Sequence, residues 1–486
     1  MTFYFYDLET SGINPRTGRI MQFGGQRTDM SLKPIGEADN FLIKLAADVL
    51  PEPDAILTHG ITPQKTQING ISEAEFLKYF SSEISQPDTI MAGFNNIRFD
   101  DEFMRFTLWR NFYDAYEWQW KNNCSKWDLL DVVRMTRALR PAGIKWPYAP
   151  DGKASNRLEF LSSVNKLTHS LAHDALSDVK AVIALARLIK SKQPKLFNYL
   201  LSVRKKTNVQ VLLGAGKAVV YTSGRYPSEF HKTTVAIKLV AHPDNRGAFM
   251  YDLRADPTPY LKMTPAELAV AWQFRPPHIV RGSTSHKEKD VVQFPLKLMA
   301  YNRAPAVAPL VVLDKASAKN IKIDMNQVLK NQEKLKSSKD FAKKILQAYE
   351  LLQPAAQPKL IFDEQQVDSQ LYDGFIPDHD KVTMSMVRAA PLEDLPTIDA
   401  GFSDERLQLL FPLYKARNFP KILNDQEQVW WENFRTHKLL DGGEASQAAS
   451  YFKRIAELKT QKHITKDQHF LLEELELYGQ SVLPLV

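Results

Sequence analysis

The sequence predicts a protein of several domains that begins with an α/β domain, continues with a β-rich domain and ends in helices. Its 486 residues exceed what a single hydrophobic core usually organises, so about two to four domains are expected. Strand-like and helix-like segments alternate up to about residue 190, which is typical of an α/β domain with a mixed sheet. Short β-type runs between turn residues follow from about 200 to 350 and suggest a small barrel or sandwich.

Residue patterns define the elements of the first region. The expected strands are Phe3–Leu8, Ile20–Thr28, Asn40–Leu45 and Thr89–Phe94. The expected helices are Thr62–Asn69, Ser72–Ser82, Glu102–Trp109, Trp127–Arg137, Arg157–Asn165 and Ala175–Lys190. Ser72 precedes Glu75 by three residues, which is the spacing of a capping box at a helix start. In the last helix Val179, Val182 and Ala186 recur at helical spacing, which predicts a buried face.

The middle and C-terminal regions have a different character. The expected strands are Val209–Leu213, Ala218–Thr222, Thr233–Val240, Ala248–Asp252 and Val291–Leu296. Two helical segments are expected around Pro265–Gln273 and Asn326–Leu346. The run 353–358, with prolines at 354 and 358, marks a domain boundary. Beyond it the sequence is polar and helix-prone, which predicts a C-terminal helical domain.

Composition and charge narrow the class of protein. A content of 44% hydrophobic and 24% charged residues is typical of a soluble globular protein. No run approaches the roughly 18 apolar residues of a membrane helix, and the N-terminus lacks the basic and apolar regions of a leader. Cys124 is the only cysteine, which excludes an intramolecular disulfide and favours the cytoplasm. A net charge of +7 favours a nucleic-acid partner, because phosphate neutralisation supplies much of such binding.

Four carboxylates and one histidine form the candidate catalytic set. Asp7 and Glu9 lie two apart on the first expected strand and therefore point to the same face. Asp100 follows the fourth strand, and His173 and Asp178 lie at the start of the last helix. Carboxylates are hard ligands for Mg²⁺ or Mn²⁺ and can hold a metal pair against a phosphodiester. A histidine can take a proton from water near neutral pH, so the combination predicts a nuclease.

Each of these segments also has a structural interpretation when taken alone. The Asp7–Glu9 pair could be a strand end that turns into solvent, and Asp174 and Asp178 could be an exposed i, i+4 pair. His173 and Asp178 would lie about 140° apart on one helix. A shared site therefore favours His173 in the loop before the helix, with Asp174 near the N-cap.

Three motifs in order resemble those of the DEDDh exonuclease superfamily. They are Asp7-Leu8-Glu9-Thr10, the Asn-x-x-Phe-Asp pattern that ends at Asp100, and the His-Asp-Ala-x-x-Asp pattern of 173–178. Much of the chain is also similar to the bacterial exonuclease I (exodeoxyribonuclease I) family. The stretches that carry this similarity are 110–114, 127–131, 139–141, 157–159, 242–246, 370–375 and 416–420.

The resemblance implies a role for each member of the catalytic set. Two Mg²⁺ ions, for which Mn²⁺ would substitute, are expected to be held by Asp7, Glu9, Asp100 and Asp178. His173 would be the general base that activates water. The family position falls on Asp100 rather than on Asp101, and Asp101 is expected to cap or solvate the following helix.

The resemblance also implies positions that bind the terminal nucleotide. They are Glu9, Thr10, Gly60, Ile61 and Arg157. Gly60 would allow close backbone approach, and Ile61 would be an apolar wedge. Arg157 could instead form a structural ion pair with Glu159. His59 stands where many relatives have Thr or Tyr, and no catalytic part is expected for it.

The family implies three domains and one activity. An α/β ribonuclease H-like exonuclease domain is expected over 1–195, an SH3-like β domain with helical insertions over 196–352, and a C-terminal all-helical domain over 353–486. The implied activity is processive 3′→5′ degradation of single-stranded DNA to 5′-mononucleotides, in DNA repair and recombination. The implied protein is a cytoplasmic monomer.

The family further implies a protein partner, the single-stranded-DNA-binding protein, whose acidic C-terminal tail ends in an apolar residue. Arg140 and Tyr199 resemble part of the pocket that takes this tail. The alternative for Arg140 is an ion pair with an acid inside the nuclease domain.

Several alternatives remain open from the sequence. RNA trimming is a second activity, and a catalytically inert single-strand-binding scaffold is a third reading that would predict loss of an acidic position. The aromatic run 112–120 could stack bases or pack into cores. The lysines of 315–344 could border a strand path or form a solvated helix face.

Overall fold

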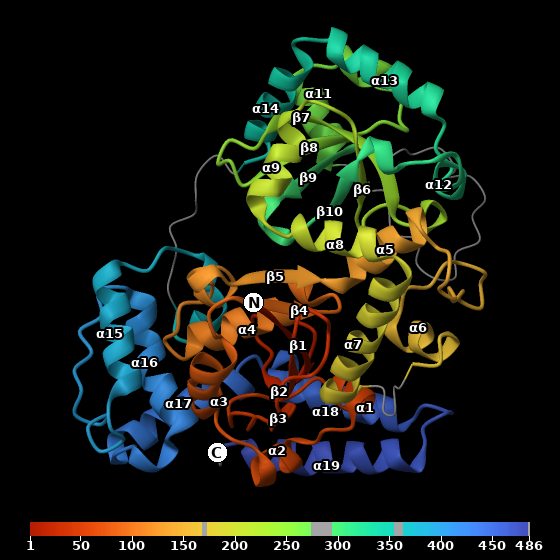
Figure 1. The fold of residues 1–486 in the computed structure, drawn as a ribbon. Helices are drawn as coiled ribbons and strands as arrows, with labels where there is room; N and C mark the ends of the chain where they lie inside the picture. Colours follow the sequence, from red (N-terminus) through yellow and green to blue (C-terminus); the bar gives the residue numbers. More distant parts are fainter. Residues whose placement is uncertain (168–172, 274–293, 354–362, 485–486) are drawn as a thin grey trace. The chain divides into compact units, whose positions relative to one another are not determined.

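The computed structural model describes residues 1–167, 173–273, 294–353 and 363–484 (Figure 1). The chain divides into two compact units. The first contains Met1–Lys126, Thr168–Ala184 and Lys359–Val486, and the second contains Trp127–Leu167 and Leu185–Pro358. Along the described residues, no helix combines the length and the apolar character needed to cross a membrane.

A five-stranded sheet organises the first unit. Its strands are β1 (Thr2–Thr10), β2 (Ile20–Thr28), β3 (Asp39–Leu42), β4 (Thr89–Gly93) and β5 (Ser125–Asp128), in the order β3-β2-β1-β4-β5. β1 pairs antiparallel with β2 and parallel with β4. The sheet is therefore mixed, as the alternating sequence pattern predicts.

Helices cover this sheet and build its core. They are α1 (Pro53–His59), α2 (Pro63–Asn69), α3 (Glu73–Tyr79), α4 (Asp100–Arg110) and the first half of α7 (Ala175–Lys192). Tyr6 and Leu8 of β1 pack in one buried cluster with Phe76 of α3 and Met104 of α4. The expected capping box of Ser72 and Glu75 is present at the start of α3. Because β1 buries its even-numbered side chains here, its odd-numbered acids point to the opposite face.

The C-terminal helices belong to the same unit. They are α15 (Asp378–Ala389), α16 (Glu405–Asn418), α17 (Asp425–Leu440), α18 (Gln447–Lys459) and α19 (Lys466–Val482), preceded by the 3₁₀ segment η8 (Val367–Tyr372). Trp109 and Phe112 share a buried cluster with Leu410 of α16. Ile56 of α1 shares another with Leu472 of α19. The sequence predicts the nuclease and helical regions as separate domains, but in the structure they share buried hydrophobic clusters.

The second unit contains an antiparallel five-stranded sheet. Its strands are β6 (Val219–Thr222), β7 (Thr233–Ala241), β8 (Gly247–Asp252), β9 (Leu296–Ala300) and β10 (Ala306–Pro309), in the order β10-β6-β7-β8-β9. The helices of this unit include α5 (Leu129–Leu139), α6 (Leu158–Val164), α8 (Pro194–Ser202), α9 (Lys206–Gly214), α10 (Thr258–Leu261), α11 (Pro265–Gln273), α12 (Lys315–Asn320), α13 (Met325–Ser337) and α14 (Phe341–Leu351). The small β-rich domain expected from the sequence is confirmed.

Some expected elements are wrong in type or extent. The strand expected at Val209–Leu213 is part of helix α9, in which Val209 and Leu213 are buried one turn apart and Val211 is 78% exposed. The helix expected at Trp127–Arg137 begins only at Leu129, after the last residues of β5. The helix expected at Asn326–Leu346 is two helices, α13 and α14.

Three further expected segments differ from the structure in extent or fall partly outside the described residues. β3 ends at Leu42 rather than Leu45. The strand expected at Val291–Leu296 lies later, as β9, and residues 291–293 lie outside the described residues. The same holds for 354–358 of the expected linker.

Candidate active site

Three of the predicted carboxylates meet at one end of the central strand. Asp7 and Glu9 of β1 and Asp178 of α7 each place a ligand oxygen within 4.8 Å of the other two. Carboxylate oxygens are hard ligands, so these three side chains suit Mg²⁺ or Mn²⁺. The alternative of a strand end turning into solvent does not hold, because Glu9 is only 9% exposed.

Two residues of β2 bring α7 to this cluster, and no role is predicted for either from the sequence. Gly24 pairs with Asp7 across the sheet, and a Cβ there would lie 2.5 Å from the backbone of Ala175 and Leu176. Gln22 donates to Asp174 (2.8 Å) and accepts from the Ala175 amide (3.2 Å). A glycine inside a strand pattern is the signal for such close backbone approach.

The start of α7 has the arrangement that a shared site favours. Asp174 accepts a hydrogen bond from the Ser177 amide at 3.0 Å, as an N-terminal cap does. His173 lies in the turn before the helix, exposed and with φ 64°, whereas Asp178 is inside it. Asp174 and Asp178 are therefore not a solvated pair of equivalent residues.

Asp100 and Asp101 differ sharply although they are neighbours. Asp100, at the first position of α4, is 3% exposed, and its charge contributes to the raised pKa values of Asp7 and Glu9. Asp101 is fully buried and accepts hydrogen bonds from Tyr6 (2.5 Å), and from Asn96 and Gln119 (3.2 and 2.5 Å). The expectation that Asp101 caps or solvates the helix is wrong, because its carboxylate is an interior acceptor.

The electrostatics of the cluster disfavour four charged carboxylates in the absence of a cation. Burial, with the charges of Asp100 and Asp178, raises the pKa of Asp7 well above its ordinary value. Burial, followed by the charges of Asp178 and Asp100, raises the pKa of Glu9 to about 8. Like charges held together in a low-dielectric site disfavour ionisation. A bound divalent cation would reverse this preference and keep the carboxylates charged.

His59 links two of the expected substrate-binding residues. Its Nε2 lies 3.2 Å from the Thr10 carbonyl oxygen, and its Nδ1 accepts from the Ile61 amide at 3.0 Å. Burial lowers the pKa of His59 to about 4, so the ring is neutral and its Nε2–H donates to Thr10. Gly60 adopts φ 73° between them, and the Ile61 side chain is 4% exposed within a core cluster. His59 therefore holds this segment in place, a role not expected from the sequence.

The remaining candidate residues belong to the second unit and are described within it. Arg157 is 72% exposed at its side chain and lies 3.7 Å from Glu159, so the alternative ion pair is present. Arg140 lies 3.3 Å from Asp314 and donates to the Val312 carbonyl at 2.8 Å. Its acidic partner thus lies in the β-rich region. Burial raises the pKa of Tyr199 to about 12.

The aromatic run 112–120 divides between the two alternatives left open. Phe112 and Trp118 are buried in separate clusters, whereas Tyr116 and Trp120 are 40% and 63% exposed. Among the lysines of 315–344, Lys334 pairs with Asp256 and Lys344 donates to backbone carbonyls. The rest lie exposed on or beside α12, α13 and α14.

The mixed sheet with a carboxylate cluster at the end of its central strand defines the class of protein. A family model described as "Exonuclease" matches residues 4–186. Two more, described as "Exonuclease I SH3-like domain" and "Exonuclease I C-terminal domain", match residues 204–351 and 365–482. The chain is an exonuclease by class, built from an exonuclease domain, an SH3-like domain and a helical C-terminal domain.

Relatives that match along nearly the whole chain identify one family within this class. The chain is 38% identical to exodeoxyribonuclease I of Haemophilus influenzae, over 99% of each chain. It matches a solved structure of Escherichia coli exonuclease I in complex with a dA16 oligonucleotide with a TM-score of 0.90 and 35% identity, over 99% of each chain. It also matches a structure described as SSB/Exonuclease I in complex with an inhibitor, with a TM-score of 0.87 and 34% identity over 99% of each chain. The chain belongs to the exonuclease I family.

Proposed function

We propose that the protein degrades single-stranded DNA from the 3′ end, processively, to 5′-mononucleotides in a Mg²⁺-dependent reaction. The observation that carries this proposal is the convergence of Asp7, Glu9 and Asp178 in a chain that resembles exodeoxyribonuclease I along its whole length. Related structures hold DNA oligonucleotides, which favours DNA over RNA as the substrate.

Each side chain has a proposed part in hydrolysis. Asp7, Glu9, Asp100 and Asp178 are the residues that would hold two Mg²⁺ ions, or Mn²⁺ in their place. When bound, such ions polarise the phosphodiester and favour ionisation of water. His173, exposed beside the cluster's helix, would take the proton of the attacking water as general base.

The substrate would be positioned by backbone and side-chain groups around the cluster. Glu9, Thr10, Gly60 and Ile61 are proposed to meet the terminal nucleotide, with Thr10 and Ile61 joined through His59. Arg157 is proposed to reach a phosphate, for which it would exchange its exposed pairing with Glu159. Exposed pairs of this kind are worth little, so the exchange costs little.

The partner and the biological setting are also proposals. The single-stranded-DNA-binding protein would dock its acidic tail against Arg140 and Tyr199, and its carboxylate would compete with Asp314 for the Arg140 guanidinium. An arginine fork suits a terminal carboxylate. We place the protein in the cytoplasm as a monomer that serves DNA repair and recombination. The proposed domain limits remain 1–195, 196–352 and 353–486.

One assay tests the function directly. Purified protein is incubated with single-stranded DNA labelled at the 3′ or the 5′ end, with blunt duplex and with RNA, each with and without Mg²⁺. The expected result is mononucleotide release from single-stranded DNA only, 3′ label first, and only with metal. Equal cleavage of RNA would assign the chain to RNA trimming, and binding of DNA without any cleavage would favour the inert scaffold.

A further inference from the structure

The loop that follows the metal-ligand strand is closed by one serine and one arginine. β1 and β2 change register between Glu9 and Thr10, so regular pairing ends next to a proposed ligand. Beyond this point the Ser11 amide donates to the Arg19 carbonyl at 2.9 Å, and the Arg19 amide donates to Ser11 Oγ at 2.9 Å. This closure therefore lies two residues beyond Glu9 along the chain.

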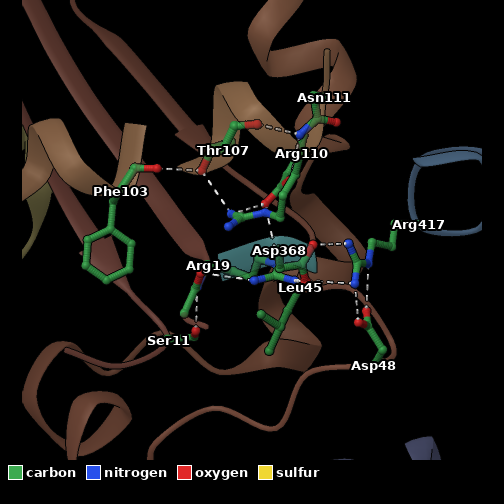
Figure 2. Close-up of polar contacts among 12 residues, drawn as sticks. Ser11, Arg19, Leu45, Asp48, Phe103, Thr107, Arg110, Asn111, Asp368 and Arg417 are labelled. Carbon is green, nitrogen blue, oxygen red and sulfur yellow. Dashed lines mark hydrogen bonds and ion pairs between the residues drawn. The ribbon is translucent and has the colours of Figure 1, made fainter. Parts of the chain in front are cut away.

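The Arg19 side chain holds the closure from inside the protein. Its Nη1 donates to the carbonyls of Thr17 and Gly18 at 2.8 and 3.2 Å, and its Nη2 donates to Asp368 Oδ2 at 2.6 Å. The Arg19 side chain is only 2% exposed. Asp368 lies in η8 of the C-terminal region, 349 residues further along the chain. Figure 2 shows Arg19 between Ser11 and Asp368.

A second arginine fixes Asp368 in turn. Arg417 donates from Nη1 to Asp368 Oδ1 at 2.8 Å and from Nη2 to Oδ2 at 2.9 Å. The same guanidinium bonds both oxygens of Asp48, at 3.2 and 2.7 Å (Figure 2). Lys438 lies 2.5 Å from Asp48. Buried cations thus bond both oxygens of Asp368 and both oxygens of Asp48, which restrains the orientation of each carboxylate.

The same element tethers the loop at a second point. Arg16, also in the β1–β2 loop, donates to the Ser369 carbonyl at 2.6 Å. Consecutive residues of η8 thus hold two arginines of the loop that ends the metal-ligand strand. This arrangement connects the C-terminal region to the loop that follows the proposed ligands Asp7 and Glu9.

We propose that Asp368 is a positioning residue for hydrolysis, acting through Arg19 and Ser11 to fix the end of β1 and with it Glu9. The inference rests on the proposed function, because it assigns the support of that same site. Groups bonded directly to a metal ligand orient it, and their loss lowers metal affinity or activity by roughly 10–100-fold. Asp368 acts through two further residues, so an effect at the lower end of that range is expected. Arg19 also lies 3.9 Å from Glu73 of α3, so Asp368, at 2.6 Å, is the closer of these two acidic partners.

The test uses the full chain and two variants of different severity. Asp368→Asn keeps the size of the side chain but removes the charge, and Ser11→Ala removes only the Oγ acceptor. Arg388→Lys is the matched control, because Arg388 also joins the helical region to the nuclease region, through the Phe112 carbonyl, but far along the chain from the loop. Mn²⁺ binding is measured by electron paramagnetic resonance without DNA, followed by kcat and KM on single-stranded DNA.

The proposal expects a metal and turnover defect without a DNA-binding defect. Asp368→Asn should weaken Mn²⁺ binding and lower kcat by roughly 10-fold, with KM little changed, and Arg388→Lys should resemble the wild type. Ser11→Ala should shift both quantities in the same direction, and the double variant should lose less than the product of the two effects.

The outcomes separate this inference from the function on which it rests. A wild-type protein that cleaves no DNA refutes the proposed function. A wild type that cleaves, with Asp368→Asn and Ser11→Ala both binding Mn²⁺ and turning over normally, overturns the positioning role alone. If Asp368→Asn does not fold, Ser11→Ala decides, and an unchanged Mn²⁺ affinity in that variant overturns the proposal.

Discussion

At the scale of single residues, the two aspartates that begin α4 have different partners. Substituting them should therefore affect different properties of the protein. Asp100→Asn should abolish cleavage and leave folding intact, because it alters a proposed ligand. Asp101→Asn should lower the free energy of unfolding by about 1–3 kcal/mol, because it disturbs a buried acceptor with three donors. Urea unfolding and cleavage assays on both variants check this. An active Asp100→Asn would contradict the ligand assignment.

His173 should affect turnover and not binding. Its side chain is exposed at the turn before α7, so its removal disturbs no core. His173→Ala should keep the affinity for single-stranded DNA and lower kcat by roughly 10²–10⁴, the usual range for a general base. The pH–rate profile of the variant should also differ from that of the wild type. A profile identical to that of the wild type would remove His173 from the mechanism.

The raised pKa of Glu9 predicts how metal and pH affect stability together. In the unfolded chain this carboxyl ionises near 4.5, whereas in the metal-free fold it keeps its proton to about 8. Between these values the folded state binds more protons, so the stability of the metal-free protein should fall as pH rises. Mg²⁺ should therefore raise the melting temperature more at pH 8 than at pH 5. An equal rise at both values would show that the cluster does not take the metal.

At the scale of elements, the contact between β2 and α7 decides whether Asp178 reaches the strand. Gly24→Ala would place a Cβ 2.5 Å from the α7 backbone, so the helix must move away. Because a displacement of about 1 Å can cost a hundredfold in rate, cleavage should fall by about that factor. Gly214→Ala is the matched control, since a Cβ there meets no atom within 4 Å. Normal cleavage by Gly24→Ala would show that α7 docks by other contacts.

The order of elements follows from local patterns, but their partners do not. β2 spans the predicted residues, and α7 starts where predicted, because periodicity and flanking residues are local signals. Val209–Leu213 was expected as a strand since its apolar residues alternate, yet Val209 and Leu213 also fit one helical face.

The same distinction between local patterns and distant contacts applies to the candidate site. Motif order predicted Asp7, Glu9 and Asp178, and the structure brings these together. Gln22 and the Arg19–Asp368 pair make contacts between distant segments, which no short pattern encodes. Gly24 alone had a local signal, a glycine inside a strand pattern.

At the scale of the whole molecule, buried ion pairs make the first unit sensitive to acid. Burial alone would raise the pKa of Asp48, but Arg417 and Lys438 outweigh it and hold the pKa below its usual range. Arg417 and Arg19 do the same for Asp368. Since unfolded aspartates ionise at about pH 3.9, this stabilisation is complete above that pH and is lost as pH falls below it. Urea unfolding should therefore require less denaturant at pH 3 than at pH 6, and Asp368→Asn should show a shallower dependence.

The composition of the first unit has a consequence for how the chain matures on the ribosome. This unit is assembled from residues 1–126, 168–184 and 359–486, and its cores join Trp109 to α16 and Ile56 to α19. Domains generally fold as they emerge during synthesis. The second unit ends at residue 358 and can therefore fold first. Residues 1–126 belong to the first unit and still lack their C-terminal packing partners at that stage. We therefore expect the nuclease region to complete its packing only after α19 (Lys466–Val482), which shares a core cluster with Ile56, has left the exit tunnel.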